Sequence, residues 1–547
     1  MNIKEELQRV VRGEVVDDEN TLKKYSTDAS IFEVRPRLVV FPKGKEDIKA
    51  IIHFIDVHPK EKLSVTCRSA GSDMSGGPLN EGIIIDVSRY MNQLKEIEGH
   101  AAVVEPGLLY RVFEKEAGRH HLLFPTYPAS KDMCAFGGIL ANNSGGEKSL
   151  VYGKTENYVE ELKVILRDGN EYVFRPLTKK ELSAKLRKKG LEGEIYSKIY
   201  KLINENWDLL QKAKPNVSKN SAGYFLWNVW DKEKEIFDLT KLLVGSQGTL
   251  GIITEAKVRL VDAKRHSVLL VIFLKNLSPL ADIVGRVLKS KPESFESYDD
   301  HTLKLVLRFL LEFVSLLGAK NILALLWQFL PELRMLISGG LPKLVLLAEF
   351  TADSLKNAKE MARAAQQNIA DFHIQTRIAA KPLDVQKYLT IRRQSFNLLR
   401  HHVKNKKSSP FIDDIIVRPE LLPKFLPELN VILAKYPDLI YTVAGHAGDG
   451  NFHIIPLMDL TDAKVRNSIP SLSKKVYDLV MRYRGSITAE HNDGLIRTPF
   501  LKQMYGKEVC NLFRKTKEIF DPKGIFNPRK KVGTSLQYAI SHIMHHN

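Results

Sequence analysis

Two histidines, His446 and His453, stand seven residues apart in a short run that also contains two glycines. The flanking segments, residues 439–443 and 454–455, are rich in β-prone side chains. This pattern favours two strands joined by a tight turn over a helix, because glycine and asparagine suit the turn positions. The sequence therefore predicts a β-hairpin that directs both imidazoles toward one point.

Glu490 and His491 follow this run after 36 residues. Imidazole nitrogen and carboxylate oxygen are ligands that zinc and similar ions accept, so His446, His453 and Glu490 form a candidate metal site. His491 would remain free to act as a base. The same residues also fit an Asx-type turn at 449–451 with both histidines hydrogen-bonded in the core, and the sequence leaves both interpretations open.

The chain has 547 residues, more than one hydrophobic core normally organises, so two or three domains are expected. Its 44% hydrophobic and 27% charged residues are ordinary for a globular protein and exclude general disorder. The net charge of +18 favours anionic partners. Because the basic residues are spread along the whole chain without a nucleic-acid-binding motif, we expect a small carboxylate ligand and no nucleic acid.

Three cysteines, Cys67, Cys134 and Cys510, lie far apart and form no Cys-x-x-Cys motif. This spacing predicts neither a disulfide framework nor an iron-sulfur cluster. The first residues are charged, and no long stretch is free of charges. We therefore expect a cytoplasmic protein, with peripheral contact at the inner face of the membrane left open.

The first half of the chain alternates short β-rich runs with helical segments, which predicts an α+β domain over residues 1–264. From residue 267 onward, strand, helix, strand and helix patterns follow in order, which predicts a second α/β domain with an antiparallel sheet. An apolar helical insertion at about 301–340 interrupts it. This insertion fits either a basic amphipathic membrane-surface element or a helical hairpin packed on the domain or on another subunit.

Two runs of small residues, 68–77 and 137–146, allow close approach of a ligand to the backbone. Each run alone also fits a tight turn. Two such runs in one domain predict a large phosphorylated cofactor.

A third motif, residues 243–255, completes a pattern. Together with the two glycine runs, it resembles the FAD-binding domain of the vanillyl-alcohol-oxidase and p-cresol-methylhydroxylase (PCMH) type. The C-terminal motifs resemble the partner domain of FAD-linked oxidases, in the branch of the D-lactate, glycolate and D-2-hydroxyglutarate dehydrogenases. The resemblance extends over about 25–532. It implies a two-subdomain FAD-binding domain (1–264), a substrate or cap domain (265–490) and a C-terminal segment (491–547) that completes the active site and returns to the FAD domain.

The resemblance also implies a non-covalent FAD site. Its residues are Ser69, Ala70, Gly71, Ser72, Asp73, Ser75 and Gly76 around the diphosphate; Gly137, Gly138, Asn142 and Ser144 at the flavin and ribityl side; Ile253 at the adenine; and Asn527 near the flavin ring. This chain has Ser69 and Ala70 where the family usually has two glycines.

For catalysis, the resemblance implies that Arg392 clamps the substrate carboxylate, although the neighbouring Arg393 fits that role equally. It implies a divalent metal, usually zinc, at His446, His453 and Glu490, and His491 as the base. The run Glu490-His-Asn-Asp-Gly494 resembles dehydrogenases whose flavoprotein half is fused to an iron-sulfur region, for which this chain lacks the cysteines.

We therefore expect an FAD-dependent dehydrogenase that oxidises a small D-2-hydroxy acid to the 2-oxo acid. Its electrons would pass to a quinone, a cytochrome or a separate iron-sulfur protein. The alternatives are an oxidase that uses oxygen, a non-redox enzyme similar to alkyl-dihydroxyacetone-phosphate synthase, and a catalytically silent membrane scaffold without flavin.

Overall fold

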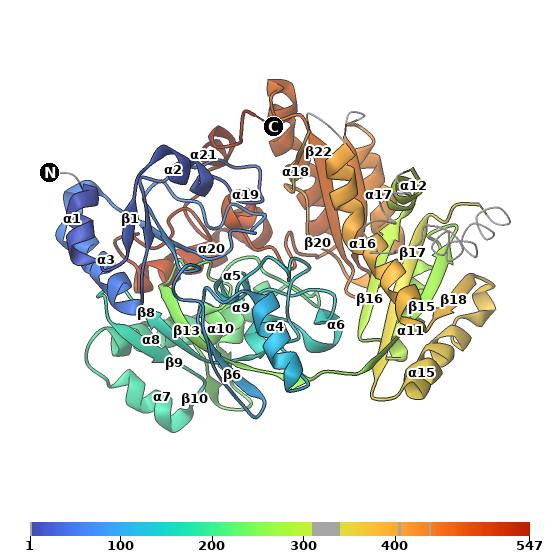
Figure 1. Cartoon of the computed structure of the whole chain (residues 1–547), viewed down its shortest axis with the longest axis horizontal. Coiled ribbons are helices and arrows are strands. Elements are labelled where there is room, and N and C mark those ends of the chain that lie inside the picture. Colours follow the sequence, from blue (N-terminus) through green and yellow to red (C-terminus); the bar gives the residue numbers. More distant parts are fainter. Residues whose placement is uncertain (1–2, 309–339, 403–405, 437–438, 547) are drawn as a thin grey trace.

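The structure, a computed structural model, describes residues 3–308, 340–402, 406–436 and 439–546. The chain forms two parts that lie side by side (Figure 1), and its C-terminal segment returns to the N-terminal part. Most of the predicted insertion, residues 309–339, lies outside the described residues. No helix within the described ranges has the length and apolar content needed to cross a membrane.

The first sheet of the N-terminal part has the order β1-β2-β4-β3. Its strands are β1 (Glu14–Val16), β2 (Leu38–Phe41), β3 (Val65–Arg68) and β4 (Ile83–Asp86). β2, β4 and β3 run parallel, and every residue of β2 and β4 is buried, as expected for a sheet covered on both faces. The helices α1 (Ile3–Val10) and α3 (Lys45–Val57) cover one face, and α2 (Glu19–Tyr25) covers the other.

A second, antiparallel sheet of the same part has the order β5-β6-β13-β8-β9. Its strands are β5 (Leu94–Glu98), β6 (Ala101–Val104), β8 (Val159–Ile165), β9 (Glu171–Phe174) and β13 (Ile252–Arg259). Successive side chains of β13 alternate between buried and more exposed, as in a strand with one buried face. Three helices pack against the core of this sheet: α4 (Tyr110–Arg119), α5 (Phe136–Asn142) and α8 (Leu191–Glu205).

The other part is built on one antiparallel sheet, on the right in Figure 1. Its strands are β15 (His266–Leu274), β16 (Ser294–Asp299), β17 (Leu344–Ala352), β18 (Gln375–Ala379), β19 (Lys407–Ser408), β20 (Ile415–Ile416), β21 (Ile440–His446) and β22 (Asn451–Met458). The helices α11 (Leu280–Lys289), α15 (Leu355–Gln367), α17 (Leu422–Leu433) and α18 (Ala463–Arg482) share one core with it.

Alternate residues of β15 belong to two different cores, which shows that this sheet is covered on both faces. Leu270 and Ile272 lie in the core with α11 and α15. Leu269 and Val271 pack with residues of α16 (Pro382–His402) on the opposite face, beside α12 (Asp300–Arg308). The prediction of an α+β fold with an antiparallel sheet in the second part is confirmed.

The predicted β-hairpin is also confirmed. Strands β21 and β22 pair in antiparallel register, with His446 opposite Asn451 and Ala444 opposite His453. The turn between them contains Gly450 at φ +73°, a conformation that glycine adopts without strain. The hairpin therefore carries both histidines at the turn end of the sheet.

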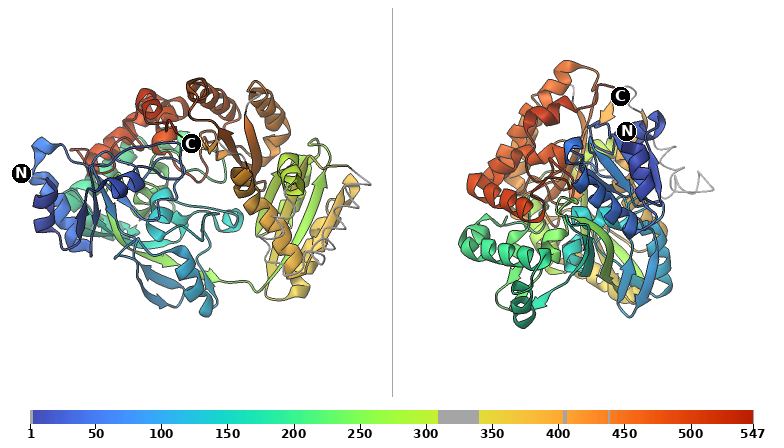
Figure 2. Two further views of the ribbon diagram at one scale, coloured as in Figure 1. Left: turned by 45° about the horizontal axis from the view of Figure 1, so that its top comes forward. Right: turned by 90° about the vertical axis from the view of Figure 1, so that its left-hand side faces the viewer.

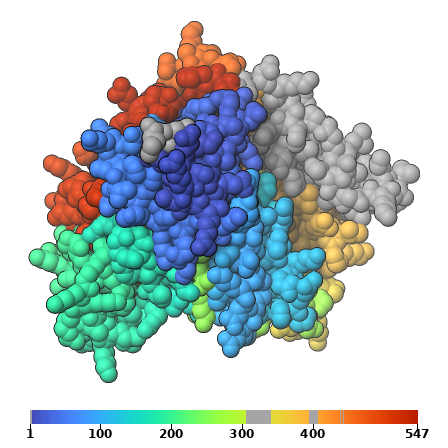
Figure 3. All heavy atoms as spheres, turned by 60° about the vertical axis from the view of Figure 1, so that its left-hand side comes forward, coloured from blue at the N-terminus to red at the C-terminus, as the bar shows by residue number. Residues whose placement is uncertain are grey.

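The C-terminal segment contains α19 (Gly494–Arg497), α20 (Leu501–Phe520) and α21 (Leu536–Ser541). It lies beside the N-terminal residues, red against blue in Figures 2 and 3, and forms bridges between Phe526 and Val65 and between Ile543 and Phe32. A fully buried ion pair joins Lys531 to Asp493 at 3.0 Å. Lys531 also donates to the carbonyl oxygen of Gly223, so the segment is tied to both Asp493 and the first half of the chain.

Replacing Lys531 by methionine is expected to lower the free energy of unfolding by about 3–5 kcal/mol, because Asp493 would keep a buried charge without its cation. Urea unfolding would measure the change. The matched control is Lys523→Met, which removes an exposed pair with Asp56 and should change the free energy by less than about 1 kcal/mol. Equal effects of the two substitutions would contradict the role of the buried pair.

Candidate active site

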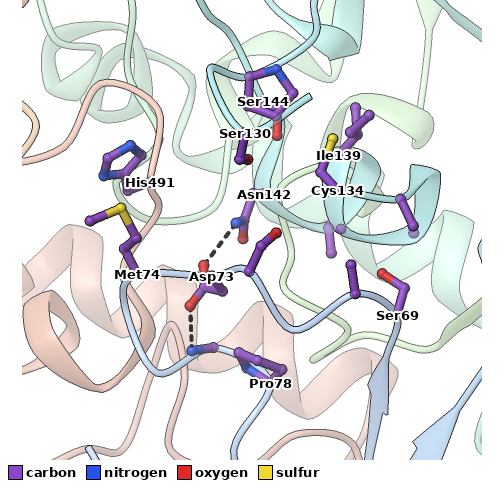
Figure 4. Close-up of a pocket in the computed structure, with 18 of the residues that line it drawn as sticks. Ser69, Asp73, Met74, Pro78, Ser130, Cys134, Ile139, Asn142, Ser144 and His491 are labelled. Atoms are coloured by element: carbon purple, nitrogen blue, oxygen red, sulfur yellow. Dashed lines mark hydrogen bonds between the residues drawn. The ribbon is translucent and has the colours of Figure 1, made fainter. Parts of the chain in front are cut away.

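A cavity of about 350 Å³ lies between the two parts. The N-terminal part lines it with the loop that follows β3, with α5 and with the start of β13. The other part contributes β21, β22 and α16, and the C-terminal region contributes Glu490 and His491. Figure 4 shows His491 beside Met74 at one side of this cavity and Ser69 at the opposite side.

The loop that follows β3 presents free backbone donors to the cavity. Residues 69–74 line it, and the N–H groups of residues 70–74 donate no hydrogen bond to other described residues. Ser75 and Gly76 lie behind this surface and do not line the cavity, because their N–H groups donate to Asp73 (2.9 Å) and Asp28 (3.1 Å). Free N–H groups in a curved loop suit an anion such as a diphosphate.

Asp73 holds the loop and α5 together. It accepts hydrogen bonds from the N–H group of Gly77 and from Asn142 Nδ2, both at 2.8 Å (Figure 4). Five further cofactor residues expected from the sequence also line the cavity: Gly137, Gly138, Asn142, Ser144 and Ile253. Asn527 is instead buried behind the loops, where its side chain donates to the carbonyl oxygens of Gly77 and Gln247.

At the other end of the cavity, three predicted donors converge. His446 Nε2 lies 3.4 Å from Glu490 Oε1, and His453 Nε2 lies 3.9 Å from Glu490 Oε2. Two ligands at about 2.0–2.1 Å from a tetrahedral zinc would lie roughly 3.4 Å apart. One donor atom from each residue lies within 4.8 Å of the others, so the set has the chemistry and spacing that a divalent cation requires.

Two buried carboxylates that sequence reasoning missed support these imidazoles. Glu296 Oε1 lies 2.6 Å from His446 Nδ1, and its other oxygen lies 2.7 Å from Arg392 Nε. Asp413 contacts Nδ1 of His453 at 3.1 Å and Nδ1 of His491 at 2.6 Å. No local motif marks either residue, because each meets its partners only through the fold.

These contacts shift the protonation of the site. Burial opposes charge on His446, but the attraction of Glu296 outweighs it and raises the pKa of His446 to about 9. Burial and Asp413 act in the same way on His491, whose pKa is also raised to about 9. Burial would raise the pKa of Glu490, yet Lys219 and His446 hold it well below its usual range. Glu296 and Asp413 therefore favour the protonated forms of His446 and His491, respectively.

Lys219 is a further site residue that the sequence did not reveal. Its side chain is fully buried, and its ammonium lies 2.5 Å from Glu490 Oε1 and 3.3 Å from Asp449 Oδ2. It belongs to the loop that follows α9 (Trp207–Ala213) in the N-terminal part. Lys219 thus engages one oxygen of Glu490 and leaves the other facing His453.

The structure separates the two neighbouring arginines. Arg393 pairs with Glu147 and its side chain is 38% exposed, whereas the side chain of Arg392 is 9% exposed. Arg392 Nη2 is buried and has no hydrogen-bond partner in the described structure. Both arginines line the cavity, but Arg392 alone of the two keeps a buried, unused donor for an anionic ligand.

Comparison with known families assigns both parts. A profile described as "FAD binding domain" matches residues 36–174, and one described as "FAD linked oxidases, C-terminal domain" matches residues 263–531. The chain therefore combines an FAD binding domain with the C-terminal domain of FAD-linked oxidases. The chain belongs to the FAD-linked oxidase family.

Two curated relatives are similar over most of this chain. A D-2-hydroxyglutarate dehydrogenase of Pseudomonas putida is 25% identical over 95% of this chain and 50% of its own length. The glycolate oxidase subunit GlcD of Bacillus subtilis is 26% identical over 97% of this chain and 96% of its own length. This chain therefore spans about half the length of the first D-2-hydroxyglutarate dehydrogenases that it matches.

Two solved structures share the fold. Substrate-bound p-cresol methylhydroxylase has a TM-score of 0.66 at 14% identity and covers 96% of this chain and 94% of its own. An alkyldihydroxyacetonephosphate synthase has a TM-score of 0.66 at 15% identity, with 94% and 83% covered. These likenesses confirm the predicted PCMH-type architecture.

Replacing Gly138 by leucine is expected to weaken FAD binding by about tenfold or more, which corresponds to about 1.4 kcal/mol. Gly138 lines the cavity, and a Cβ atom there would meet only Ser69 Oγ, at 3.5 Å, so a longer side chain would occupy cofactor space. The flavin absorbance per protein, measured after gel filtration, reports the loss. Gly118→Leu, at an exposed helical glycine with open space around it, should retain full flavin content.

Proposed function

We propose that the protein is an FAD-dependent dehydrogenase that oxidises a D-2-hydroxy acid to the corresponding 2-oxo acid. One observation carries the proposal: Arg392, which keeps an unused guanidinium nitrogen, and His491 line the same cavity. A guanidinium suits a carboxylate, and an imidazole suits the proton of a neighbouring hydroxyl. The names of two curated relatives, a D-2-hydroxyglutarate dehydrogenase and a glycolate oxidase subunit, refer to 2-hydroxy acids and support oxidation of a 2-hydroxy acid.

In this mechanism Arg392 binds the substrate carboxylate and presents C2 to the flavin. Asp413 holds Nδ1 of His491, so Nε2 accepts the hydroxyl proton, and the carboxylate stabilises the imidazolium that forms. Non-covalent FAD supplies the acceptor for the hydride that leaves C2. The free N–H groups of residues 70–74 would hold its diphosphate.

His446, His453 and Glu490 would hold a divalent cation, and zinc fits these ligands best. Such an ion lowers the pKa of a bound hydroxyl group. Its charge would also oppose the raised pKa of His491 and favour the neutral imidazole that a base requires.

We also propose domain boundaries near residues 264 and 490. We further propose that electrons leave the flavin for a quinone, a cytochrome or a separate iron-sulfur protein. We place this reaction in the cytoplasm or at the inner face of the membrane.

Anaerobic bleaching of the flavin absorbance by a panel of D- and L-2-hydroxy acids tests the proposal. Bleaching by one D-acid, without rapid peroxide formation in air, would support the dehydrogenase. Rapid peroxide formation would instead identify an oxidase. Bound flavin that no acid reduces would contradict the proposal and favour non-redox chemistry, and purified protein that binds no flavin would contradict both.

Removal of the metal is expected to slow flavin reduction by about 100-fold, because a Lewis acid at the hydroxyl contributes several kcal/mol. Stopped-flow reduction before and after chelation would measure the change, with metal content determined in each sample. Adding back zinc or manganese should restore the rate. An unchanged rate in protein shown to be free of metal would exclude metal assistance.

A further inference from the structure

Two buried carboxylates, Glu296 and Asp413, link the proposed cation donors to the substrate-binding residues. Glu296, on β16, has one oxygen at His446 Nδ1 and the other at Arg392 Nε. Asp413, just before β20, has one oxygen at Nδ1 of His453 and the other at Nδ1 of His491. Each carboxylate therefore contacts one cation donor and one residue of the substrate reaction.

Neither carboxylate serves as a brace for the backbone. Within the described structure, the side chains of Glu296 and Asp413 accept no hydrogen bond from a backbone N–H group. The adjacent Asp414 is the opposite case: it accepts from the N–H groups of Glu490 (2.8 Å) and His491 (2.7 Å) and from Thr488 Oγ1 (2.6 Å). Asp414 thus shapes the loop, whereas the Asp413 side chain makes its hydrogen bond and its closest ion pair with the two imidazoles.

Both carboxylates are almost fully buried, and burying a charge is costly unless ionic partners compensate it. For Glu296 the compensation comes chiefly from His446 and Arg392, with a further contribution from Lys219. For Asp413 it comes chiefly from His491 and His453. A carboxylate at Nδ1 fixes the proton on that nitrogen, orients the ring and leaves Nε2 as the donor or base. Such an arrangement acts on the imidazoles and the guanidinium rather than on the backbone.

We infer that Glu296 and Asp413 are paired positioning residues of the site, an inference that rests on the proposed hydroxy-acid oxidation. Glu296 couples the cation donor His446 to the carboxylate clamp Arg392. Asp413 couples the cation donor His453 to the base His491. One carboxylate thus serves substrate binding and the other serves proton transfer.

The two roles predict different kinetic effects. Asparagine at position 413 would offer one oxygen and one NH₂ group to two Nδ1 atoms that both require an acceptor. One imidazole would then take the other tautomer, with its proton on Nε2. His491 would lose the basic Nε2, or His453 would lose the Nε2 lone pair that would bind the cation. We expect the limiting rate of flavin reduction to fall about 100-fold, whereas Glu296→Gln should mainly raise the substrate Kd, by about tenfold or more.

The experiment follows anaerobic flavin reduction over a range of concentrations of the acid that reduces the wild-type holoenzyme. This measurement separates the limiting rate from Kd, and zinc bound after gel filtration gives a second readout that does not depend on activity. The matched control is Glu349→Gln on β17, a half-buried carboxylate of the sheet that contains Glu296, which contacts Ser267 and Ser294. It should retain the wild-type rate, Kd and zinc content.

The inference holds if Asp413→Asn loses rate or zinc while it keeps its flavin content and melting temperature, and if Glu296→Gln mainly weakens substrate binding. It is overturned if both variants keep the wild-type rate, Kd and zinc content. It is equally overturned if Asp413→Asn loses flavin and stability as Asp414→Asn should, because Asp413 would then be a structural brace. If no acid reduces the wild-type flavin, the proposed function fails, and zinc content still reports on the carboxylates.

Discussion

Replacing His491 by asparagine is expected to slow flavin reduction by the D-2-hydroxy acid substrate by about 10²–10⁴-fold, the usual contribution of a positioned general base. Asparagine keeps a polar side chain of similar reach but cannot accept a proton at neutral pH. The substrate Kd should change little, because Arg392 provides the main charged contact. Anaerobic stopped-flow reduction over a range of substrate concentrations separates these two quantities.

The matched control is His266→Asn, which changes an exposed histidine on β15. It should reduce the flavin at the wild-type rate. A His491→Asn enzyme that keeps its flavin, its bound metal and its wild-type rate would show that another group takes the proton.

The second large effect concerns substrate binding. Arg392→Met is expected to raise the substrate Kd by about 100-fold or more, since removal of one partner from a buried charge pair costs about 2–5 kcal/mol. Part of this loss comes from Glu296, which would keep its charge without the guanidinium. Titration of the oxidised flavin with the 2-oxo acid product measures the Kd of the product without turnover, and this Kd should rise similarly because the product keeps the carboxylate that Arg392 binds.

Arg393→Met is the matched control, because Arg393 is the adjacent residue of α16 and already pairs with Glu147. Its Kd should rise by less than about tenfold, as expected for a partly exposed ion pair. Arg392→Lys should recover only part of the affinity, since an ammonium group lacks the planar fork of the guanidinium. A larger effect at Arg393 than at Arg392 would reverse the assignment.

The parts of the site that the sequence predicted are those governed by local rules. The β21–β22 hairpin follows from glycines between β-prone runs, and the cavity-lining segments around Gly71 and Gly138 follow from runs of small residues. These features depend on neighbouring positions, so a linear pattern can encode them. The antiparallel sheet of the second part follows from its strand and helix order in the same way.

The remaining parts depend on contacts between distant segments. Glu296 lies 150 residues before His446, and Lys219 lies 271 residues before Glu490, so no spacing could connect them. Adjacent residues of a helix point in different directions, so the choice between Arg392 and Arg393 depends on how α16 is oriented toward its neighbours. The sequence does not give that orientation. Ser75, Gly76 and Asn527 shared the expected motifs but lie behind the cavity wall, a depth that a sequence pattern does not encode.

The bridges from Val65 to Phe526 and from Phe32 to Ile543 also constrain how the protein is made. Val65 lies on β3, the edge strand of the first sheet, but its partner Phe526 is synthesised several hundred residues later. During translation, the surfaces that Phe526 and Ile543 cover would stay exposed until those residues have been synthesised. An uncovered strand edge can pair with other chains, so we expect chaperones that hold incomplete chains to protect this edge during that interval.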